Sequence, residues 1–355
     1  MITKTTDISI PNVHLIARHY NPADVLFFDI ETTGFSPRSS SLYLIGVMYY
    51  EHDSWKLRQW LAETESDEPL LLHSFIQFAA NYVYLIHFNG DRFDLPYVKA
   101  KCETHNQTFL PEQLNSIDIY LKVKPLKKYL KLTHLNQRSL EEYLETDRTD
   151  TTNGGELIPI CREYQKNHDP RLCEQLLWHN HDDLRGLAGL FPLLSYLDLI
   201  NGRFAITHTE ISEESDHAFS LLITASLPCN LPKPISCKLD FGYMTAHDKT
   251  CKIQIPGFTG TLKYFFRDYK NYYYLPAEDT AMHKSVASFI DKAYRVPAKA
   301  ATCFQKKSGS FLPQATELYV PAFKENYSDP VTYFECTPEF LENTENLLTY
   351  IQNLF

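Results

Sequence analysis

Long apolar runs are missing from this chain of 355 residues. No stretch approaches the roughly 20 apolar residues that a helix needs to cross a bilayer, and the longest candidate, residues 190–200, contains Pro192 and Asp198. The first twenty residues alternate polar and apolar side chains and lack the apolar centre of a signal peptide. The sequence therefore predicts a protein without a membrane span.

Closely spaced cysteine pairs are also missing. The eight Cys are scattered and form no C-x-x-C pair, which argues against a zinc ribbon and against a disulfide framework. We therefore expect a reduced, cytoplasmic location. The chain has no internal repeat or low-complexity tract, and its apolar content of 44% and charged content of 22% are ordinary for a soluble globular protein.

An overall excess of positive charge, common in proteins that bind nucleic acids, is absent too. The formal net charge is −10, and residues 1–200 hold 19 Lys and Arg against 27 Asp and Glu. Residues 238–307 differ, with 12 basic and 6 acidic residues, a balance of +6. A local basic region matters more for phosphate binding than the charge of the whole chain, so the acidic total does not exclude a nucleic acid.

Two carboxylates stand at the end of an apolar strand. Residues 25–28 are all apolar, which is typical of a strand buried on both faces, and Asp29 and Glu31 follow. Positions i and i+2 of a strand point to the same side, so the two carboxylates project together. Unpaired, they would repel each other and be costly to bury, and Mg²⁺ or Mn²⁺ would relieve both costs. The alternative is a strand end at which both groups point into water.

A third acid follows the next apolar strand. Residues 84–88 run into a Gly turn, and a helix is predicted over residues 93–102. Asp94 would lie in its first turn, where a negative charge suits the helix dipole. A plain helix-cap role would explain Asp94 equally well.

A later helix carries a histidine and an acid on one face. The amphipathic pattern predicts this helix over residues 172–190, and His179 and Asp183 are four positions apart in it. A packed or surface histidine is the alternative. Asp182 points about 100° away from Asp183, so we predict that it is solvated. Residues 146–155, rich in Thr, Asp and Gly, are predicted to be a loop.

Together, three motifs resemble those of the DEDD exonuclease superfamily, which has an RNase H-like fold. Asp29-Ile30-Glu31 with Thr32-Thr33-Gly34 resembles its first motif, residues 89–94 resemble the second, and residues 180–184 resemble the third. The run Gly-Gly-Glu-Leu-Ile-Pro at residues 154–159, followed by Tyr164, is most similar to the YprB-like branch of predicted exonucleases. The resemblance covers about residues 25–198.

This resemblance implies a fold, an activity and a metal site. The implied fold is α/β, an RNase H-like mixed five-stranded sheet flanked by helices. The implied activity is 3′→5′ exonucleolytic hydrolysis of phosphodiester bonds by a two-metal mechanism with Mg²⁺ or Mn²⁺. Carried over position by position, the metal-binding acids are Asp29, which would bridge both ions, Glu31, Asp94 and Asp183.

The histidine departs from the superfamily pattern. Members have Tyr four residues, or His five residues, before the last acid, whereas this chain has His179 at the four-residue spacing and Trp178 at the five-residue spacing. We expect His179 to occupy the Tyr-like site and to act on the attacking water, since the ordinary His pKa of about 6.5 lies near working pH. Asp118 resembles an aspartate kept between the second and third motifs and could orient the site; it could equally be a strand-end acid.

Four segments are predicted along the chain. Strands are expected near residues 25–30, 41–50, 56–61 and 84–88, with a turn at residues 51–54. The segments are an N-terminal extension (1–24), an RNase H-like exonuclease domain (25–198), a connector (199–234) and a smaller α+β accessory domain (235–355).

Substrate contacts are expected from both predicted domains. Thr32, Asn89 and Phe93 are candidates beside the acids. In the accessory domain Lys284 and Lys299 lie among aromatic residues, and such surfaces can hold single strands by stacking and phosphate contact. An aromatic sheet core with solvated lysines is the alternative.

Two functions of different classes follow. The first is a divalent-metal-dependent exonuclease acting on DNA or RNA, and the second is a nucleic-acid-binding protein on a nuclease-like fold that does not cleave. The four acids favour the enzyme, and the spacing of His179 keeps the second open. Nucleic acid is the expected partner, and no protein partner can be inferred. The choice between DNA and RNA depends on 2′-hydroxyl contacts.

Overall fold

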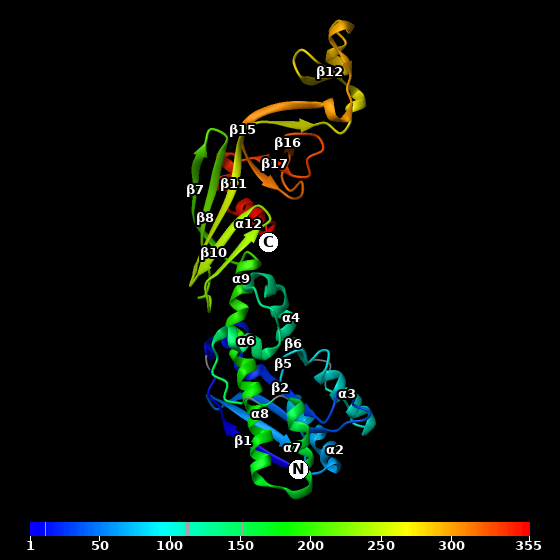
Figure 1. Cartoon of the computed structure of the whole chain (residues 1–355), viewed down its shortest axis with the longest axis vertical. Coiled ribbons are helices and arrows are strands. Elements are labelled where there is room, and N and C mark those ends of the chain that lie inside the picture. Colours follow the sequence, from blue (N-terminus) through cyan, green and yellow to red (C-terminus); the bar gives the residue numbers. More distant parts are fainter. Residues whose placement is uncertain (11, 111–113, 151, 153) are drawn as a thin grey trace. The chain divides into compact units, whose positions relative to one another are not determined.

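The computed structural model of the chain describes residues 1–10, 12–110, 114–150, 152 and 154–355. They divide into two compact units, Met1–Ser195 and Tyr196–Phe355 (Figure 1). Every helix in this described part of the chain is too short or too polar to span a membrane.

The described residues of the first unit form a six-stranded mixed sheet, in the order β1-β4-β3-β2-β5-β6. β2 pairs antiparallel with β3 and parallel with β5. The resemblance implied five strands, and four were predicted at specific residues; β1 and β6 are not among those four. β1 lies in the predicted N-terminal extension and pairs along its whole length with β4. The strands are β1 (Ile2–Asp7), β2 (Val25–Thr32), β3 (Leu42–Glu51), β4 (Ser54–Leu61), β5 (Tyr84–His87) and β6 (Asn115–Asp118).

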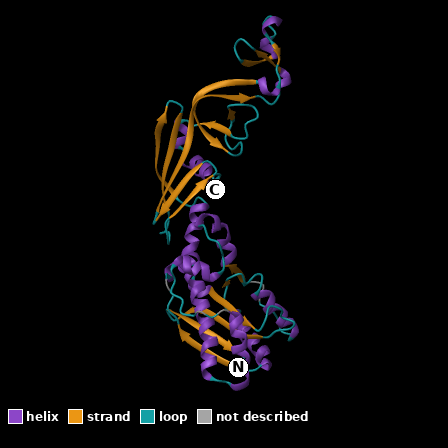
Figure 2. Ribbon diagram, in the orientation of Figure 1, coloured by secondary structure: helices purple, strands orange, loops and turns teal. Residues whose placement is uncertain are grey.

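Helices flank this sheet, as Figure 2 shows. Alternate residues of β2 face opposite sides: Phe28 stacks on Phe75, with ring centroids 4.6 Å apart, whereas Phe27 lies edge-on to Phe191. Asp29 and Glu31 share the side of Phe27 because side chains alternate along a strand. The helices are α1 (Val13–His19), α2 (Glu68–Ala79), α3 (Asp94–Thr104), α4 (Ile119–Val123), α5 (Lys127–Leu130), α6 (Gln137–Leu144), α7 (Gly154–Asn167) and α8 (Pro170–Gly189).

The second unit is mainly β. Its larger, eight-stranded sheet contains β7 (Ala205–Ser215), β8 (Ala218–Ser226), β9 (Ile235–Leu239), β10 (Gly242–His247), β11 (Thr250–Phe265), β15 (Phe304–Gln314), β16 (Phe323–Lys324) and β17 (Thr332–Glu335). A three-stranded sheet contains β12 (Tyr272–Leu275), β13 (Thr280–His283) and β14 (Val296–Pro297). The helices are α9 (Ser195–Ile200), α10 (Lys284–Ala287), α11 (Pro338–Glu342) and α12 (Thr344–Gln352).

The predicted connector over residues 199–234 is part of this sheet. It contains β7 and β8, and β8 pairs with β11 from Ala218 to Ser226. The last part of the predicted connector holds three prolines, a composition typical of a linker, but Pro228, Pro232 and Pro234 occupy only the loop between β8 and β9. Proline lacks a backbone donor and suits such a loop, so it marked the end of a strand instead of a domain boundary.

Candidate metal centre

The two acids of β2 lie where three strands and a helix meet. Glu31 is 7% exposed and Asp29 is half-buried. Asp29 lies opposite Gly46 of β3, which in turn lies opposite Gln59 of β4. Asn180 of α8 bridges them: its Nδ2 donates to Asp29 Oδ2 (2.8 Å), and Gln59 Nε2 donates to its Oδ1 (2.9 Å). The buried amides therefore fix helix α8 against the strand that carries the acid.

The approach of α8 to the sheet depends on a glycine. A Cβ at position 46 would lie 1.9 Å from Asn180 Oδ1 and 2.7 Å from Leu184 Cδ1. We therefore expect Gly46→Ala to destabilise the first unit by about 1–3 kcal/mol, the usual cost of overpacking. All three tryptophans lie in the first unit, so urea unfolding followed by their fluorescence measures the effect there.

Gly154→Ala is the matched control for this substitution, because a Cβ at position 154 would meet nothing within 4 Å. It should leave the midpoint unchanged or raise it slightly, since Ala favours a helix over Gly by about 1 kcal/mol. Equal midpoints for Gly46→Ala and the wild type would contradict the close approach.

The histidine and the acid of α8 meet the acids of β2. His179 Nε2 is 3.2 Å from Asp183 Oδ2 and 3.5 Å from Glu31 Oε1. Ligand atoms of Glu31, His179 and Asp183 all lie within 4.8 Å of one another. Asp29, His179 and Asp183 also line a common cavity of about 310 Å³. Residues some 150 positions apart in sequence thus converge on one small space.

Asp94 is the remaining predicted acid. It is the first residue of α3 and is 7% exposed. Burial raises the pKa of Asp94 to about 7, although backbone hydrogen bonds at Asp94 and Ile30 oppose the shift. Its charge contributes to the raised pKa values of Asp29 and Glu31. Among the described ligand clusters none includes Asp94, so its place beside the other acids rests on this electrostatic coupling.

Burial and mutual repulsion make the carboxylates of this site difficult to ionise. Burial, and then the charges of Asp183, Glu31 and Asp94, raise the pKa of Asp29 well above its ordinary value. Burial likewise raises the pKa of Glu31 to about 8, although the charge of His179 opposes the shift. Such buried, mutually repelling carboxylates offer the hard oxygen ligands that Mg²⁺ and Mn²⁺ prefer. The residues therefore fit a divalent cation.

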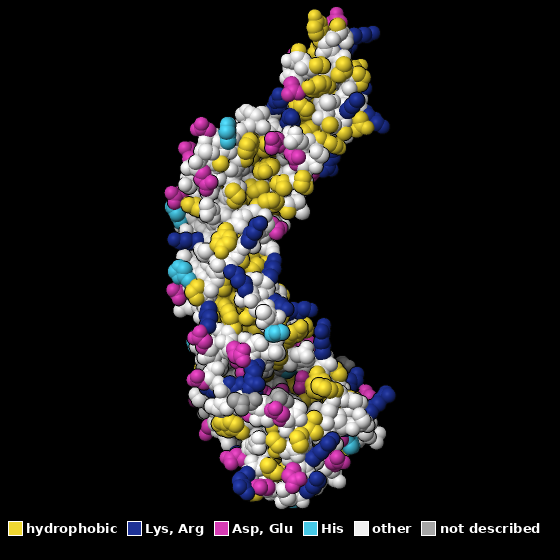
Figure 3. All heavy atoms as spheres, in the orientation of Figure 1, with side chains coloured by type: hydrophobic (Ala, Val, Ile, Leu, Met, Phe, Trp, Pro, Cys, Tyr) yellow, Lys and Arg dark blue, Asp and Glu magenta, His cyan; other side chains and the backbone are white. Residues whose placement is uncertain are grey.

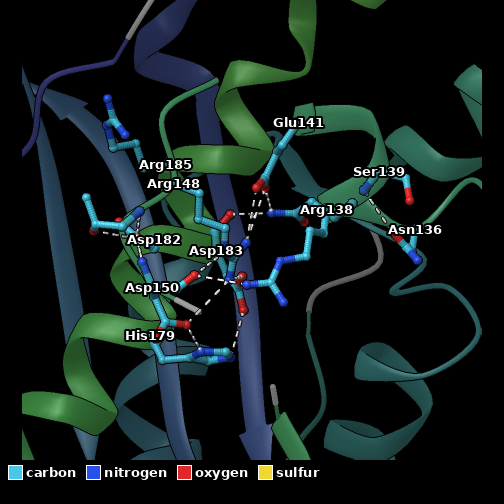
Figure 4. A network of polar contacts seen from close by, with 12 residues as sticks. Asn136, Arg138, Ser139, Glu141, Arg148, Asp150, His179, Asp182, Asp183 and Arg185 are labelled. Carbon is cyan, nitrogen blue, oxygen red and sulfur yellow. Dashed lines mark hydrogen bonds and ion pairs between the residues drawn. The ribbon is translucent and has the colours of Figure 1, made fainter. Parts of the chain in front are cut away.

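Asp183 differs because it has cationic partners. Burial would raise its pKa, but the hydrogen bond and charge of His179, and then Arg148, lower it. Arg148 contacts Asp183 Oδ1 and also lies 3.2 Å from Glu141 Oε2 (Figure 4). Asp183 is therefore held ready as a carboxylate.

Asp150, from the predicted loop, fixes the histidine ring. Its Oδ2 lies 2.5 Å from His179 Nδ1, so Nε2 is directed at Glu31 and Asp183. Burial would lower the pKa of His179, but Asp183, Glu31 and Asp150 raise it to about 9. Neither Arg148 nor Asp150 was identified from the sequence, because nothing in a Thr- and Asp-rich loop indicates which of its side chains returns to a helix.

The prediction that Asp182 is solvated was wrong. Asp182 is 4% exposed, and one of its carboxylate oxygens accepts hydrogen bonds from Thr149 N (3.0 Å), Thr149 Oγ1 (2.9 Å) and Asp150 N (2.8 Å). It does point away from Asp183, but the loop covers that side of α8 and takes the place of water. Of this loop, Thr151 and Asn153 lie outside the described residues.

Asp118 caps a helix. Its Oδ1 accepts from the backbone N–H groups of Asn89 and Tyr120, each at 2.9 Å, which matches the strand-end reading. Its Oδ2 is buried without a hydrogen-bond partner among the described residues. Its charge also raises the pKa of Asp94, so it acts on the neighbouring acid as well.

The predicted substrate contacts are spread over both units. Thr32 Oγ1 donates to Gly34 O (3.0 Å), and the Phe93 ring packs against Tyr97, with centroids 5.7 Å apart. Asn89 has a left-handed backbone (φ 58°) just after β5. In the second unit, Lys284 Nζ lies 5.6 Å from the centroid of Tyr273, and Lys299 precedes a 3₁₀ turn, Ala300–Thr302.

Comparisons with known proteins agree with this architecture. Residues 26–195 match the family model of the RNase_H superfamily. The chain is 27% identical over 200 residues to the uncharacterized protein YprB of Bacillus subtilis, covering 55% of this chain and 48% of YprB. The chain therefore spans about half the length of this curated relative.

The chain is also similar to a solved structure, the family B DNA polymerase from the hyperthermophilic archaeon Pyrobaculum calidifontis. The TM-score is 0.40 and the identity 16%, over 71% of this chain and 35% of the polymerase. A likeness of that size supports no conclusion about this chain.

Proposed function

We propose that the chain is a divalent-metal-dependent exonuclease, because residues 26–195 match the RNase_H superfamily model and the chain is similar to YprB over 200 residues. It would hydrolyse phosphodiester bonds of DNA or RNA, in the 3′→5′ direction. The observation that carries the proposal is the convergence of Glu31, His179 and Asp183, with Asp29 in the same cavity. Acids with a purely structural role would gain nothing from lying this close together, because their charges repel one another and burial makes the repulsion more costly.

Asp29, Glu31, Asp94 and Asp183 are the residues that would hold two Mg²⁺ or Mn²⁺ ions. Such ions supply a lowered pKa for the attacking water and charge stabilisation at the departing oxygen. The chain itself supplies the alignment. Asn180 holds the carboxylate of Asp29 by a hydrogen bond, and Arg148 and His179 keep Asp183 ionised.

His179 is the proposed proton acceptor. Asp150 holds its Nδ1, which leaves Nε2 facing the acids. With a pKa of about 9 the ring is protonated at neutral pH, so it can accept a proton only when the negative charge of Glu31 and Asp183 is offset. The proposed base, like the proposed metal-binding acids, therefore requires a bound cation that offsets the negative charge of the site.

The remaining proposed contacts bind the strand. Thr32, Asn89 and Phe93 are the proposed contacts of the first unit. For the second unit, taken by itself, the proposed contacts are Lys284 and Lys299. Near Lys284, Arg295 Cζ lies 4.7 Å from the centroid of the Tyr273 ring, so basic and aromatic side chains occur together here, as they do on surfaces that bind single strands. Four other aromatic residues of the same region instead pack around a small core: Phe266, Tyr269, Tyr272 and Tyr274.

The scattered cysteines support a cytoplasmic location.

Degradation of end-labelled oligonucleotides tests the proposed activity. DNA and RNA, single- and double-stranded, are incubated with Mg²⁺, Mn²⁺ or EDTA. We expect a 3′ label to be released as a mononucleotide, and a 5′ label to remain on a ladder of shorter strands, only with a divalent ion. Tight binding without shortening under every condition would reject the nuclease in favour of the non-cleaving binding protein.

A further inference from the structure

A second cavity, of about 700 Å³, adjoins the one that holds the carboxylates. Phe88, Asn136 and Gln137 line both cavities. Gln137 Nε2 donates to the backbone oxygen of Asp183 (2.7 Å), so the shared wall is fastened to the helix that carries the acid. A ligand in the larger cavity would therefore extend towards Asp29 and Asp183.

The larger cavity is basic, in contrast to its neighbour. Arg92, Lys127 and His134, all exposed, line it, and none of its described lining residues is acidic. Lys127 belongs to residues 119–140, which contain five Lys, one Arg and no Asp or Glu. This segment is thus +6 in a chain of net charge −10. Figure 3 shows Lys and Arg side chains over the part of the first unit that contains α4.

Two aromatic rings stand in the same cavity. Phe88 and Tyr120 both line it, are only partly buried, and meet edge to face with centroids 5.8 Å apart. A positive groove with aromatic faces is the usual surface for a single-stranded nucleic acid, because every unpaired base has a face that can stack. In a duplex these faces are occupied by neighbouring bases.

We infer that this cavity binds a single-stranded nucleic acid and directs its end to the carboxylates. Arg92 and Lys127 hold backbone phosphates, and a base lies against Tyr120 or Phe88. A volume of about 700 Å³ lies within the range of about 300–1,000 Å³ that is common for ligand clefts. The fate of the strand rests on the proposed function, whereas its binding does not.

Binding measured in EDTA tests the inference without requiring hydrolysis. Fluorescence anisotropy is recorded for a 5′-labelled oligo(dT) and oligo(U) of twelve nucleotides, and for a duplex of equal length, between about 50 and 200 mM salt. We expect the Arg92→Ala/Lys127→Ala double variant to bind the single strands at least about tenfold more weakly. Its salt slope should also decrease by about 1.4, since each lost phosphate contact on a single strand contributes about 0.7. Tyr120→Ala should weaken binding about fivefold or more through lost stacking.

The matched control is Arg162→Ala/Lys166→Ala, which removes one Arg and one Lys from exposed positions of α7. It should bind as the wild type does. Equal losses in the two double variants would make the effect one of net charge and overturn the inference, as would wild-type binding by Arg92→Ala/Lys127→Ala. A duplex bound as tightly as the single strands would overturn it too. If the wild type binds in EDTA but degrades nothing with metal, the proposed exonuclease fails and this site stands.

Discussion

Asp29→Asn should lower metal-dependent hydrolysis by about 10³-fold or more. The substitution keeps the size of the side chain and an oxygen that can still accept from Asn180 Nδ2, but removes the charge that a divalent ion requires. Loss of metal-based stabilisation is worth several kcal/mol in the transition state, and each 1.36 kcal/mol is tenfold in rate. Hydrolysis of labelled strands in Mn²⁺ measures the loss of activity, and calorimetric titration with Mn²⁺ measures the loss of metal binding separately.

The fold of the Asp29→Asn variant should survive, since the substitution removes one of several carboxylates whose charges repel one another. Its unfolding midpoint by tryptophan fluorescence should equal that of the wild type or exceed it. Glu103→Gln, an exposed carboxylate on α3, is the control and should leave activity and Mn²⁺ binding unchanged. Wild-type hydrolysis by Asp29→Asn would refute the two-ion assignment.

His179→Ala should lower the rate by about 10²–10⁴-fold, the usual contribution of a positioned acid or base. The ring lies within 3.5 Å of both Glu31 and Asp183, so its removal also takes a cation from the acids. The measurement is single-turnover cleavage of a labelled strand at saturating Mn²⁺. A rate within a few-fold of the wild type would show that another group takes the proton.

Asp150→Asn probes the positioning of that ring. The side chain loses its charged bond to His179 Nδ1, while the backbone of Asp150 still bonds to Asp182. We expect kcat to fall, by less than in His179→Ala, with KM unchanged. A purely structural role would instead lower the unfolding midpoint and alter both constants, and Trp178, whose Nε1 donates to Thr149 Oγ1 of this loop (3.1 Å), would report such a change.

The central strands could be predicted because their signal is local. The strand predicted at residues 25–30 is β2 (Val25–Thr32), and the predicted turn at residues 51–54 joins β3 to β4. β1 could not, because Ile2–Asp7 is largely polar and mostly exposed, and only pairing with β4 makes it a strand. The strands in residues 205–226 were not predicted, because the prolines that follow them are also typical of a connector, and the second domain was therefore predicted to begin only at residue 235.

The residues of the site also differ in whether a local pattern predicts them. The acids were predictable from strand and helix periodicity and from their resemblance to known motifs. Arg148 and Asp150 were not, since a loop side chain meets α8 only in the folded chain. Gly46 gave a weak signal, a lone glycine within an apolar strand, which often marks a close backbone approach.

The hydrogen bonds that link Asp29, Asn180 and Gln59 also fix the position of α8 on the sheet. Gln59 donates to the backbone oxygen of Leu177 as well as to the side chain of Asn180, so these bonds form only at one height and one rotation of the helix. A helix shifted by one residue would forfeit these bonds and withdraw His179 and Asp183 together. The same hydrogen bonds that position the helix therefore determine whether the side chains of the candidate site come together.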